Sequence, residues 1–167
     1  KEPPKEYIKN LFNDYAERFD DSLVEKLQYK LPFIIKEFII ELSNTTSKFK
    51  KVIDLGCGTG LAGPSLIEFS DNLTGIDLSE NMIKKAKKLD IYDSLIVGDI
   101  VEQLELSEEK YDLFVALDVF IYIGDLTSIF NAVRKRGNKN SCFIFSIETQ
   151  TDEGYSLLKS SRYAHSD

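Results

Sequence analysis

The chain has 167 residues, of which 43% are hydrophobic and 29% charged, as is typical of a globular domain with its own core. A formal net charge of −7 disfavours broad, non-specific binding to DNA or RNA. No apolar run is long enough to span a membrane, and the N-terminal Lys-Glu-Pro-Pro is unlike a signal peptide.

Residues 1–49 are predicted to be mostly helical and to form a cap. A first helix is indicated by apolar residues at helical spacing: Tyr7, Ile8, Leu11, Phe12, Tyr15 and Phe19. A second short segment is expected at Leu23 to Gln28, and Pro32 suits the first turn of a third helix. The buried stripe of this third helix is expected to contain Leu31, Ile34, Ile35, Phe38 and Leu42.

Residues 50–167 are predicted to form an α/β core, because strand and helix patterns alternate along them. Strands are predicted at Val52–Leu55, Leu73–Asp77, Ser94–Val97, Tyr111–Leu117 and Cys142–Ile147. Helices are predicted at Leu61–Phe69, after an N-cap at Ser79, and from Asp125 to a stop at Gly137. We expect an open, mostly parallel, doubly wound sheet, with the cap and the core forming a single globular domain overall.

The tail, Thr149–Asp167, is too short for another full βαβ unit and is expected to hold one strand around Tyr155–Leu158. We therefore expect the C-terminal strands to be incomplete. Because the chain also lacks an initiator Met, we interpret it as processed, trimmed or partial.

The most informative segment is Val52–Gly60, Val-Ile-Asp-Leu-Gly-Cys-Gly-Thr-Gly. Two β-branched residues lead to Asp54, and glycines follow at positions 56, 58 and 60 before a helical pattern begins. A strand, a tight glycine loop and a helix N-terminus in this order form a nucleotide pocket. The question is which nucleotide the loop binds.

One interpretation is a dinucleotide site. Gly58, Gly60 and Gly63 satisfy the pattern G-x-G-x-x-G, and Asp77 lies 19 residues after Gly58, as a ribose-binding acid should. A nicotinamide or flavin cofactor would fit this frame.

Three features instead favour a ligand that carries a cation and lacks a phosphate. Asp54 would repel a pyrophosphate and attract a positively charged group. Pro64 directly follows Gly63, where a dinucleotide site requires close packing of helix on strand. Asp99, just past the third predicted strand, can accept a hydrogen bond from the exocyclic amine of a base. S-adenosylmethionine combines a ribose, an adenine and a cationic amino group without a phosphate.

The chain resembles the class I S-adenosylmethionine-dependent methyltransferases over about residues 50–148. The resemblance rests on segment 52–60 together with Leu-Thr-Gly-Ile-Asp-Leu-Ser at 73–79, Val-Gly-Asp-Ile at 97–100 and Tyr-Asp-Leu-Phe-Val-Ala-Leu-Asp-Val-Phe at 111–120. More narrowly, Tyr-Ala-Glu-Arg-Phe-Asp at 15–20, Tyr-Ile-Gly-Asp at 122–125 and Arg-Tyr-Ala-His-Ser at 162–166 are similar to a bacterial group of predicted methyltransferases sometimes fused to tetratricopeptide repeats.

The resemblance implies roles for particular residues. Asp54 would contact the amino group of the cofactor, Asp77 would accept both ribose hydroxyls, and Asp99 would meet the adenine amine. The full set of cofactor-binding residues implied is Tyr15, Asp54, Gly56, Cys57, Gly58, Gly60, Leu61, Asp77, Leu78, Met82, Asp99, Ile100, Leu117 and Asp118.

Each acid in this set also has a structural alternative. Asp54 can orient the glycine loop, and Asp77 can cap the following helix. Asp99 can be a turn residue after Gly98, and Asp118 a solvated loop acid.

Four other residues have alternatives of the same kind. Helix packing is the alternative for Tyr15, and core packing for Cys57 and Met82. For His165, a structural or exposed role is favoured over that of a general base.

The predicted reaction is in-line displacement of the sulfonium methyl group by an O, N, S or C nucleophile. The acidic chain favours a small molecule or a protein as the acceptor, and no catalytic residue is assigned. A non-catalytic S-adenosylmethionine-binding module and an NAD(P)- or flavin-dependent oxidoreductase remain as alternatives. The two cysteines, Cys57 and Cys142, indicate neither a disulfide framework nor a metal cluster, so we expect a cytoplasmic protein without a metal.

Overall fold

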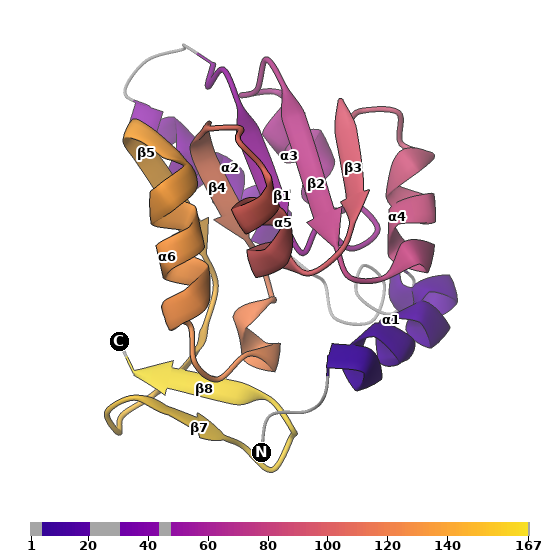
Figure 1. Cartoon of the computed structure of the whole chain (residues 1–167), viewed down its shortest axis with the longest axis vertical. Helices are drawn as coiled ribbons and strands as arrows, with labels where there is room; N and C mark the ends of the chain where they lie inside the picture. The colour runs from indigo at the N-terminus through magenta and orange to yellow at the C-terminus, as the bar shows by residue number, and fades with distance from the viewer. Residues whose placement is uncertain (1–4, 21–30, 44–47, 167) are drawn as a thin grey trace.

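The computed structural model describes residues 5–20, 31–43 and 48–166, and its centre is a parallel five-stranded sheet in the order β3-β2-β1-β4-β5 (Figure 1). The strands are β1 Val52–Leu55, β2 Leu73–Asp77, β3 Ser94–Val97, β4 Tyr111–Ala116 and β5 Gly137–Phe145. β1 lies at the centre, where Val52 is paired with Leu73 on one side and Leu113 on the other. The apolar runs of β1 and β4 are buried on both faces, as expected for interior parallel strands.

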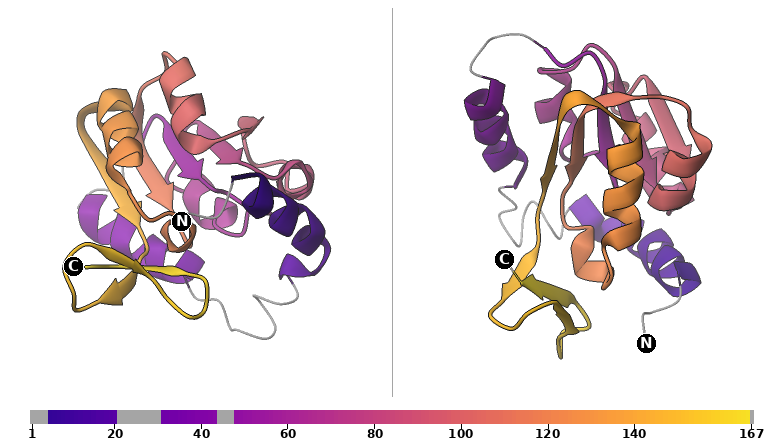
Figure 2. Two further views of the ribbon diagram at one scale, coloured as in Figure 1. Left: turned by 60° about the horizontal axis from the view of Figure 1, so that its bottom comes forward. Right: turned by 60° about the vertical axis from the view of Figure 1, so that its left-hand side comes forward.

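Helices cover both faces of this sheet, and Figure 2 shows α2 and α6 on opposite sides of it. On one face α2 (Leu31–Ser43) and α3 (Gly63–Ile67) pack over Val52, Leu73 and Leu113. On the other face α5 (Ile100–Leu106) and α6 (Thr127–Arg136) cover Ile53 and Phe114. α4 (Glu80–Lys87) packs against β2 and β3, and α1 (Lys5–Asp20) packs against α4. The predicted doubly wound α/β fold is therefore confirmed.

The tail folds into a separate sheet instead of extending the main one. β6 (Glu148–Gln150), β7 (Tyr155–Leu157) and β8 (Tyr163–Ser166) pair in the order β6-β8-β7. This sheet lies past the carboxyl ends of the main strands, where β8 contacts the short 3₁₀ helix η2 (Phe120–Tyr122) (Figure 1). The prediction of one strand near Tyr155 was correct, but the two partner strands were not predicted.

The predicted buried stripe of α2 is only partly correct. Ile35 is 2% exposed, as expected, but Ile34 and Phe38 are 41% and 52% exposed, and Ile39, which was not predicted to be buried, is 0% exposed. The helix is apolar on more than one side, so periodicity alone did not identify the side that faces the sheet. The side chains of Phe19 and Leu42, and the predicted segment Leu23 to Gln28, lie outside the described residues.

Other predicted boundaries also shift. α3 is shorter than predicted, β4 ends one residue earlier, and β5 begins at Gly137, which was expected only to end the preceding helix. α5 was not predicted as a helix, although Asp99 begins it as an N-cap. None of the helices within residues 5–20, 31–43 and 48–166 has the length and apolar character needed to cross a membrane.

Candidate functional site

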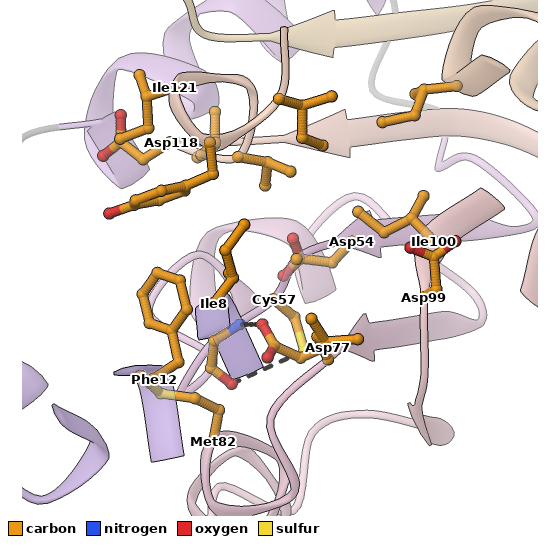
Figure 3. A pocket seen from close by; sticks show the side chains of 18 of the residues that line it. Ile8, Phe12, Asp54, Cys57, Asp77, Met82, Asp99, Ile100, Asp118 and Ile121 are labelled. Carbon is orange, nitrogen blue, oxygen red and sulfur yellow. Dashed lines mark hydrogen bonds between the residues drawn. The ribbon is translucent and has the colours of Figure 1, made fainter. Parts of the chain in front are cut away.

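A cavity of about 590 Å³ lies at the carboxyl ends of the main strands, and Figure 3 shows the side chains around it. Because β1, β2 and β4 are parallel, the residues that follow them meet at one edge of the sheet. Asp54, Asp77, Asp99 and Asp118 all line this cavity. Its volume is within the range usual for small-molecule sites.

The glycine loop begins its turn at Gly56, directly after β1. Gly56 has φ +72°, and a Cβ atom there would lie 2.4 Å from Cγ2 of Val119. The position therefore needs glycine both for its left-handed backbone and for the close approach of Val119. The backbone N–H groups of Gly56 and Cys57 both donate to the carbonyl oxygen of Ile76, which ties the loop to β2.

Asp77 is fixed by two backbone donors at the end of β2. Its Oδ2 accepts from Gly58 N at 2.9 Å, and its Oδ1 accepts from Ser79 N at 2.8 Å. Burial raises the pKa of this carboxyl, while the two N–H bonds act in the opposite direction. The 19-residue spacing in the sequence thus corresponds to a direct bond between loop and carboxylate. Each carboxylate oxygen has a further lone pair that can accept from a ligand hydroxyl.

Asp54 is buried at the end of β1, and its only hydrogen-bond donor among the described residues is Tyr92. The Tyr92 hydroxyl donates to Asp54 Oδ2 at 2.8 Å. Burial raises the pKa of Asp54 to about 7, and the bond from Tyr92 opposes this shift. Burial also raises the pKa of Tyr92, so its hydroxyl stays protonated and remains a donor. A cation bound beside Asp54 would compensate for the cost of ionising it.

The glycine at the end of the dinucleotide frame has a packing role. A Cβ atom on Gly63 would lie 2.9 Å from the Tyr92 hydroxyl and 2.7 Å from Cδ1 of Ile91. A Cβ atom on Gly60 or Gly75 would likewise lie 3.2 Å or 3.0 Å from the Tyr92 ring. These glycines make room for the tyrosine that reaches Asp54. The G-x-G-x-x-G spacing therefore has an explanation that involves no pyrophosphate.

The predicted adenine end of the cavity is formed after β2 and β3. Leu78, Met82, Asp99 and Ile100 line it, and Met82 is only 1% exposed. Oδ1 of Asp99 accepts from Glu102 N at 3.1 Å and caps α5, so Asp99 lines the cavity while also serving as a helix cap.

Asp118 follows β4 in a left-handed conformation with φ +55°. Its backbone N–H donates to Ser146 Oγ at 2.7 Å, which links the end of β4 to the segment after β5. A non-glycine residue in this region is uncommon and is found preferentially where function requires it. Leu117 lines the cavity beside it.

α1 closes one side of the cavity with Ile8, Phe12 and Tyr15 (Figure 3 labels the first two). The helix is attached to α4 through Asn13, whose Oδ1 accepts from Ser79 Oγ at 2.6 Å. In addition, Asn81 Nδ2 donates to the Asn13 carbonyl oxygen at 3.2 Å. Ser79 and Asn81, at the start of α4, therefore also hold α1 in position.

All the predicted cofactor residues except Gly60 line the cavity. Gly60 supports the site indirectly, since its positive φ of 90° turns the loop. His165 is buried away from the cavity, with Nε2 3.1 Å from the carbonyl oxygen of Phe120, in line with the structural role favoured for it. Cys57 lines the cavity, and burial raises the pKa of its thiol.

Several lining or supporting residues were not predicted. Tyr92 and Asn13 carry no motif, and their roles depend on contacts that are distant along the chain. Phe12 was assigned to a helix stripe without a ligand-facing role. Tyr122 and Arg162 lie within two segments that carried the narrower family resemblance, which was the available signal. Among the described residues, no three His, Cys, Asp or Glu side chains are grouped so as to hold a metal ion.

Comparison with protein families gives a match to a methyltransferase domain over residues 46–162. A curated relative, the ubiquinone biosynthesis O-methyltransferase of Hydrogenovibrio crunogenus, is 26% identical over 153 residues, covering 89% of this chain and 63% of the relative. The enzyme of the same name from Actinobacillus pleuropneumoniae is 25% identical, covering 65% of this chain and 50% of the relative. The chain thus spans between half and two thirds of the length of these relatives.

Solved structures share the fold. An S-adenosylmethionine-dependent methyltransferase from Clostridium acetobutylicum superposes with a TM-score of 0.64 at 29% identity, covering 83% of this chain and 58% of that one. A complex of DhpI with SAH superposes with a TM-score of 0.74 at 16% identity, covering 97% and 81%. The latter supports the fold alone.

Proposed function

The chain belongs to the methyltransferase domain family, and on that premise we propose that it transfers the methyl group of S-adenosylmethionine to a small-molecule acceptor. The acceptor nucleophile would displace the methyl group in line with the carbon–sulfur bond that breaks. The electron pair of that bond would stay on sulfur, leaving S-adenosylhomocysteine as the product.

The observation that carries the proposal is the set of carboxylates around the cavity. Asp54 and Asp77 lie near the carboxyl ends of the adjacent parallel strands β1 and β2, and burial raises the pKa of both. Buried carboxylates need a cation or hydrogen-bond donors. A ligand that presents an amino group to Asp54 and a ribose diol to Asp77 supplies both. This donor set fits S-adenosylmethionine, whereas the pyrophosphate of a dinucleotide would face Asp54 unfavourably.

When bound, S-adenosylmethionine would supply a methyl carbon that is already electrophilic. The chain's own contribution is to bind, orient and exclude water. Ile8, Phe12 and Ile121 present apolar side chains to the cavity. Asp118 and Tyr122 are among the polar residues that line the cavity on the η2 side, where we place the acceptor. We assign no catalytic base.

A small-molecule acceptor is supported by the relatives, which are named for O-methylation in ubiquinone biosynthesis. A hydroxyl oxygen is accordingly the acceptor atom that we favour. The net charge of −7 argues against nucleic acid as the acceptor.

We further propose roles for the N-terminal residues and for two motif segments, and a cellular compartment. Of residues 1–49, expected to cap a core of residues 50–167, α1 would act as the cap, as its lining residues support, whereas α2 packs on the sheet. Two segments that carry the resemblance to the bacterial group sometimes fused to tetratricopeptide repeats line the cavity: 122–125 through Tyr122, Ile123 and Asp125, and 162–166 through Arg162. The free thiols of Cys57 and Cys142 are compatible with the cytoplasm.

The test is calorimetry with S-adenosylmethionine, S-adenosylhomocysteine and NADH on the wild type, Asp77→Ala and Asp93→Ala. Asp93 is a matched control because its Oδ2 also accepts a backbone N–H, from Leu73 at 2.7 Å, but it does not line the cavity. We expect both sulfur nucleotides to bind the wild type and Asp93→Ala. Asp77→Ala should weaken them by at least about tenfold, since charge-assisted hydrogen bonds contribute about 1.5–3 kcal/mol each.

Uptake of NADH in place of the sulfur nucleotides would contradict the proposal and support the oxidoreductase alternative. A methyltransferase must also release S-adenosylhomocysteine in the presence of an acceptor. If S-adenosylmethionine binds tightly but no S-adenosylhomocysteine is released with any of a panel of phenols and hydroxy acids, the chain would instead be a non-catalytic binding module.

A further inference from the structure

Arg162 is the only basic residue that lines the cavity within the described part of the chain. Five aspartates line the same cavity, and three of them, Asp54, Asp77 and Asp99, are accounted for by the proposed cofactor. The family resemblance assigns Arg162 no role in binding that cofactor. A single basic residue in the lining of an otherwise acidic cavity indicates a ligand group of opposite charge.

The position of Arg162 is fixed by the packing of the C-terminal sheet. Its carbonyl oxygen accepts from Leu158 N at 2.8 Å, and the preceding Ser161 adopts φ +63°. Immediately after it, β8 is held to η2 by the contact of His165 with the Phe120 carbonyl oxygen. The turn that carries Arg162 is therefore anchored to the same element that forms the cavity wall.

Only one edge of the Arg162 guanidinium is engaged. Its Nε lies 3.0 Å from Oε2 of Glu148, so the two side chains form an ion pair. The contact does not have the geometry of a hydrogen bond, because Oε2 has no hydrogen-bond partner among the described residues. Within the described residues no hydrogen bond to the two terminal nitrogens is present, and the side chain is 45% exposed. A guanidinium held at Nε still presents two parallel N–H donors, the arrangement that binds a carboxylate or phosphonate oxygen pair.

Beside this cation the cavity wall is aromatic. Burial raises the pKa of Tyr122; the positive charge of Arg162 opposes this shift, and the negative charge of Asp118 adds to it. The Tyr122 ring packs edge-on against Phe12, with ring centres 5.1 Å apart. Ile121 lines the cavity from the same 3₁₀ helix. The surroundings suit an apolar or aromatic body that ends in an anion.

We propose that the methyl acceptor is a small molecule with an apolar or aromatic body and one oxyanion, of carboxylate or phosphonate type, which Arg162 binds. This inference rests on the proposed methyl transfer at the same cavity. Arg162 would select the acceptor and orient it, leaving the other end of the molecule toward the cofactor.

The test uses the full chain loaded with S-adenosylhomocysteine, whose affinity is measured first. Ligand-observed NMR titrations then compare 3-phenylpropionate, phenylphosphonate and the neutral 3-phenylpropionamide. The variants are Arg162→Gln and, as a matched control, Arg134→Gln, which removes the same charge from the exposed side of α6.

We expect the wild type and Arg134→Gln to bind at least one anion about tenfold more tightly than the amide. Arg162→Gln should bind the anions and the amide equally. Tighter binding of 3-phenylpropionate would identify the acceptor as a carboxylate, and tighter binding of phenylphosphonate would identify it as a phosphonate. Equal binding of acid and amide by the wild type, no binding of either anion, or a preference that survives in Arg162→Gln would each overturn the inference.

The titrations are repeated without S-adenosylhomocysteine. Failure of the wild type to bind S-adenosylhomocysteine counts against the proposed cofactor, whatever the anions do. Normal binding of S-adenosylhomocysteine without an anion preference counts against the role of Arg162 alone.

Discussion

At the scale of single residues, the pairing of Asp54 with Tyr92 is the most consequential feature of the site. An unperturbed aspartate has a pKa of 3.8, whereas burial raises the pKa of Asp54 to about 7. Between these values the folded chain holds a proton that the unfolded chain has released. The stability of the ligand-free protein should therefore fall as the pH rises from about 4 to 7 and level off above that.

Ligand binding should show the opposite dependence on pH, because a cationic ligand requires ionised Asp54. We expect the affinity for S-adenosylhomocysteine to fall more than about tenfold between pH 7.5 and pH 5.5, since each pKa unit corresponds to 1.36 kcal/mol. Calorimetry in two buffers of different ionisation enthalpy would detect the proton released on binding. Asp54→Asn should bind weakly, with a flat pH profile.

Tyr92→Phe refines this expectation. Removing the hydroxyl removes a bond that lowers the pKa of Asp54, so the midpoint of the profile should move to higher pH. Tyr7→Phe, at a residue 60% exposed, is the matched control and should leave the profile unchanged. An unshifted midpoint in Tyr92→Phe would show that this bond does not control the ionisation of Asp54.

The aspartates of the site could be predicted from the sequence, but the residues that contact and position them could not. Asp54 and Asp77 were found because each ends an apolar strand, and the parallel topology brings strand ends together. Tyr92 and Asn13 reach the site from loops and helices whose path no local pattern specifies. Arg162 could not be placed for the same reason: the packing of its sheet under η2 is a long-range contact.

At the scale of elements, α1 is joined to the core chiefly at the start of α4. Ser79 caps α4 by accepting from Met82 N, and its hydroxyl proton goes to Asn13. The cap of one helix is thus also the attachment point of another. Ser79 was predicted as a cap from its position before a helical pattern, whereas its partner on α1 was not.

Asn13→Ala should loosen α1 without unfolding the core. Losing the Asn13 acceptor removes about 1–2 kcal/mol of docking energy, so amide exchange across Lys5–Asp20 should accelerate by roughly five- to thirtyfold. Mass spectrometry of deuterium uptake measures this directly. Asp14→Ala, one residue further along on the exposed side, should exchange like the wild type.

α2 provides a test of which helix face is buried. Ile39→Ala removes a fully buried side chain and should lower the free energy of unfolding by about 2–5 kcal/mol. Ile34→Ala makes the same chemical change at a position 41% exposed and should cost less than about 1 kcal/mol. Urea denaturation of both variants compares them, and a loss in Ile34→Ala equal to or larger than that in Ile39→Ala would contradict the burial of Ile39 against the core.

At the scale of the whole molecule, the central sheet was predictable because its strands are short apolar runs separated by helix patterns. The tail sheet was not, because its strands are three or four residues long and largely polar. Its residues pack closely nonetheless: a Cβ atom on Gly124 would lie 2.6 Å from the Tyr155 ring. Such contacts form between segments that are 31 residues apart and leave no periodic signal.

The overall charge leads to a prediction about salt. The chain carries a net charge of −7, and five carboxylates line the cavity. S-adenosylmethionine carries one more positive charge than S-adenosylhomocysteine, and the Debye length shrinks from about 10 Å at 0.1 M salt to about 3 Å at 1 M. We expect the affinity for S-adenosylmethionine to fall about threefold more than that for S-adenosylhomocysteine over this range. If calorimetry shows that both ligands lose affinity by the same factor, the electrostatic field of the protein does not distinguish S-adenosylmethionine from S-adenosylhomocysteine.

The separate C-terminal sheet has an evolutionary consequence. The carboxylates at the ends of β1 and β2 belong to the central sheet, whereas Arg162 lies in the turn between β7 and β8 of a small sheet with its own hydrogen-bond pairing. Substitutions in residues 148–166 can therefore accumulate without disturbing the strands that carry Asp54 and Asp77. Such a division lets a lineage exchange one acceptor for another while it inherits the cofactor site intact.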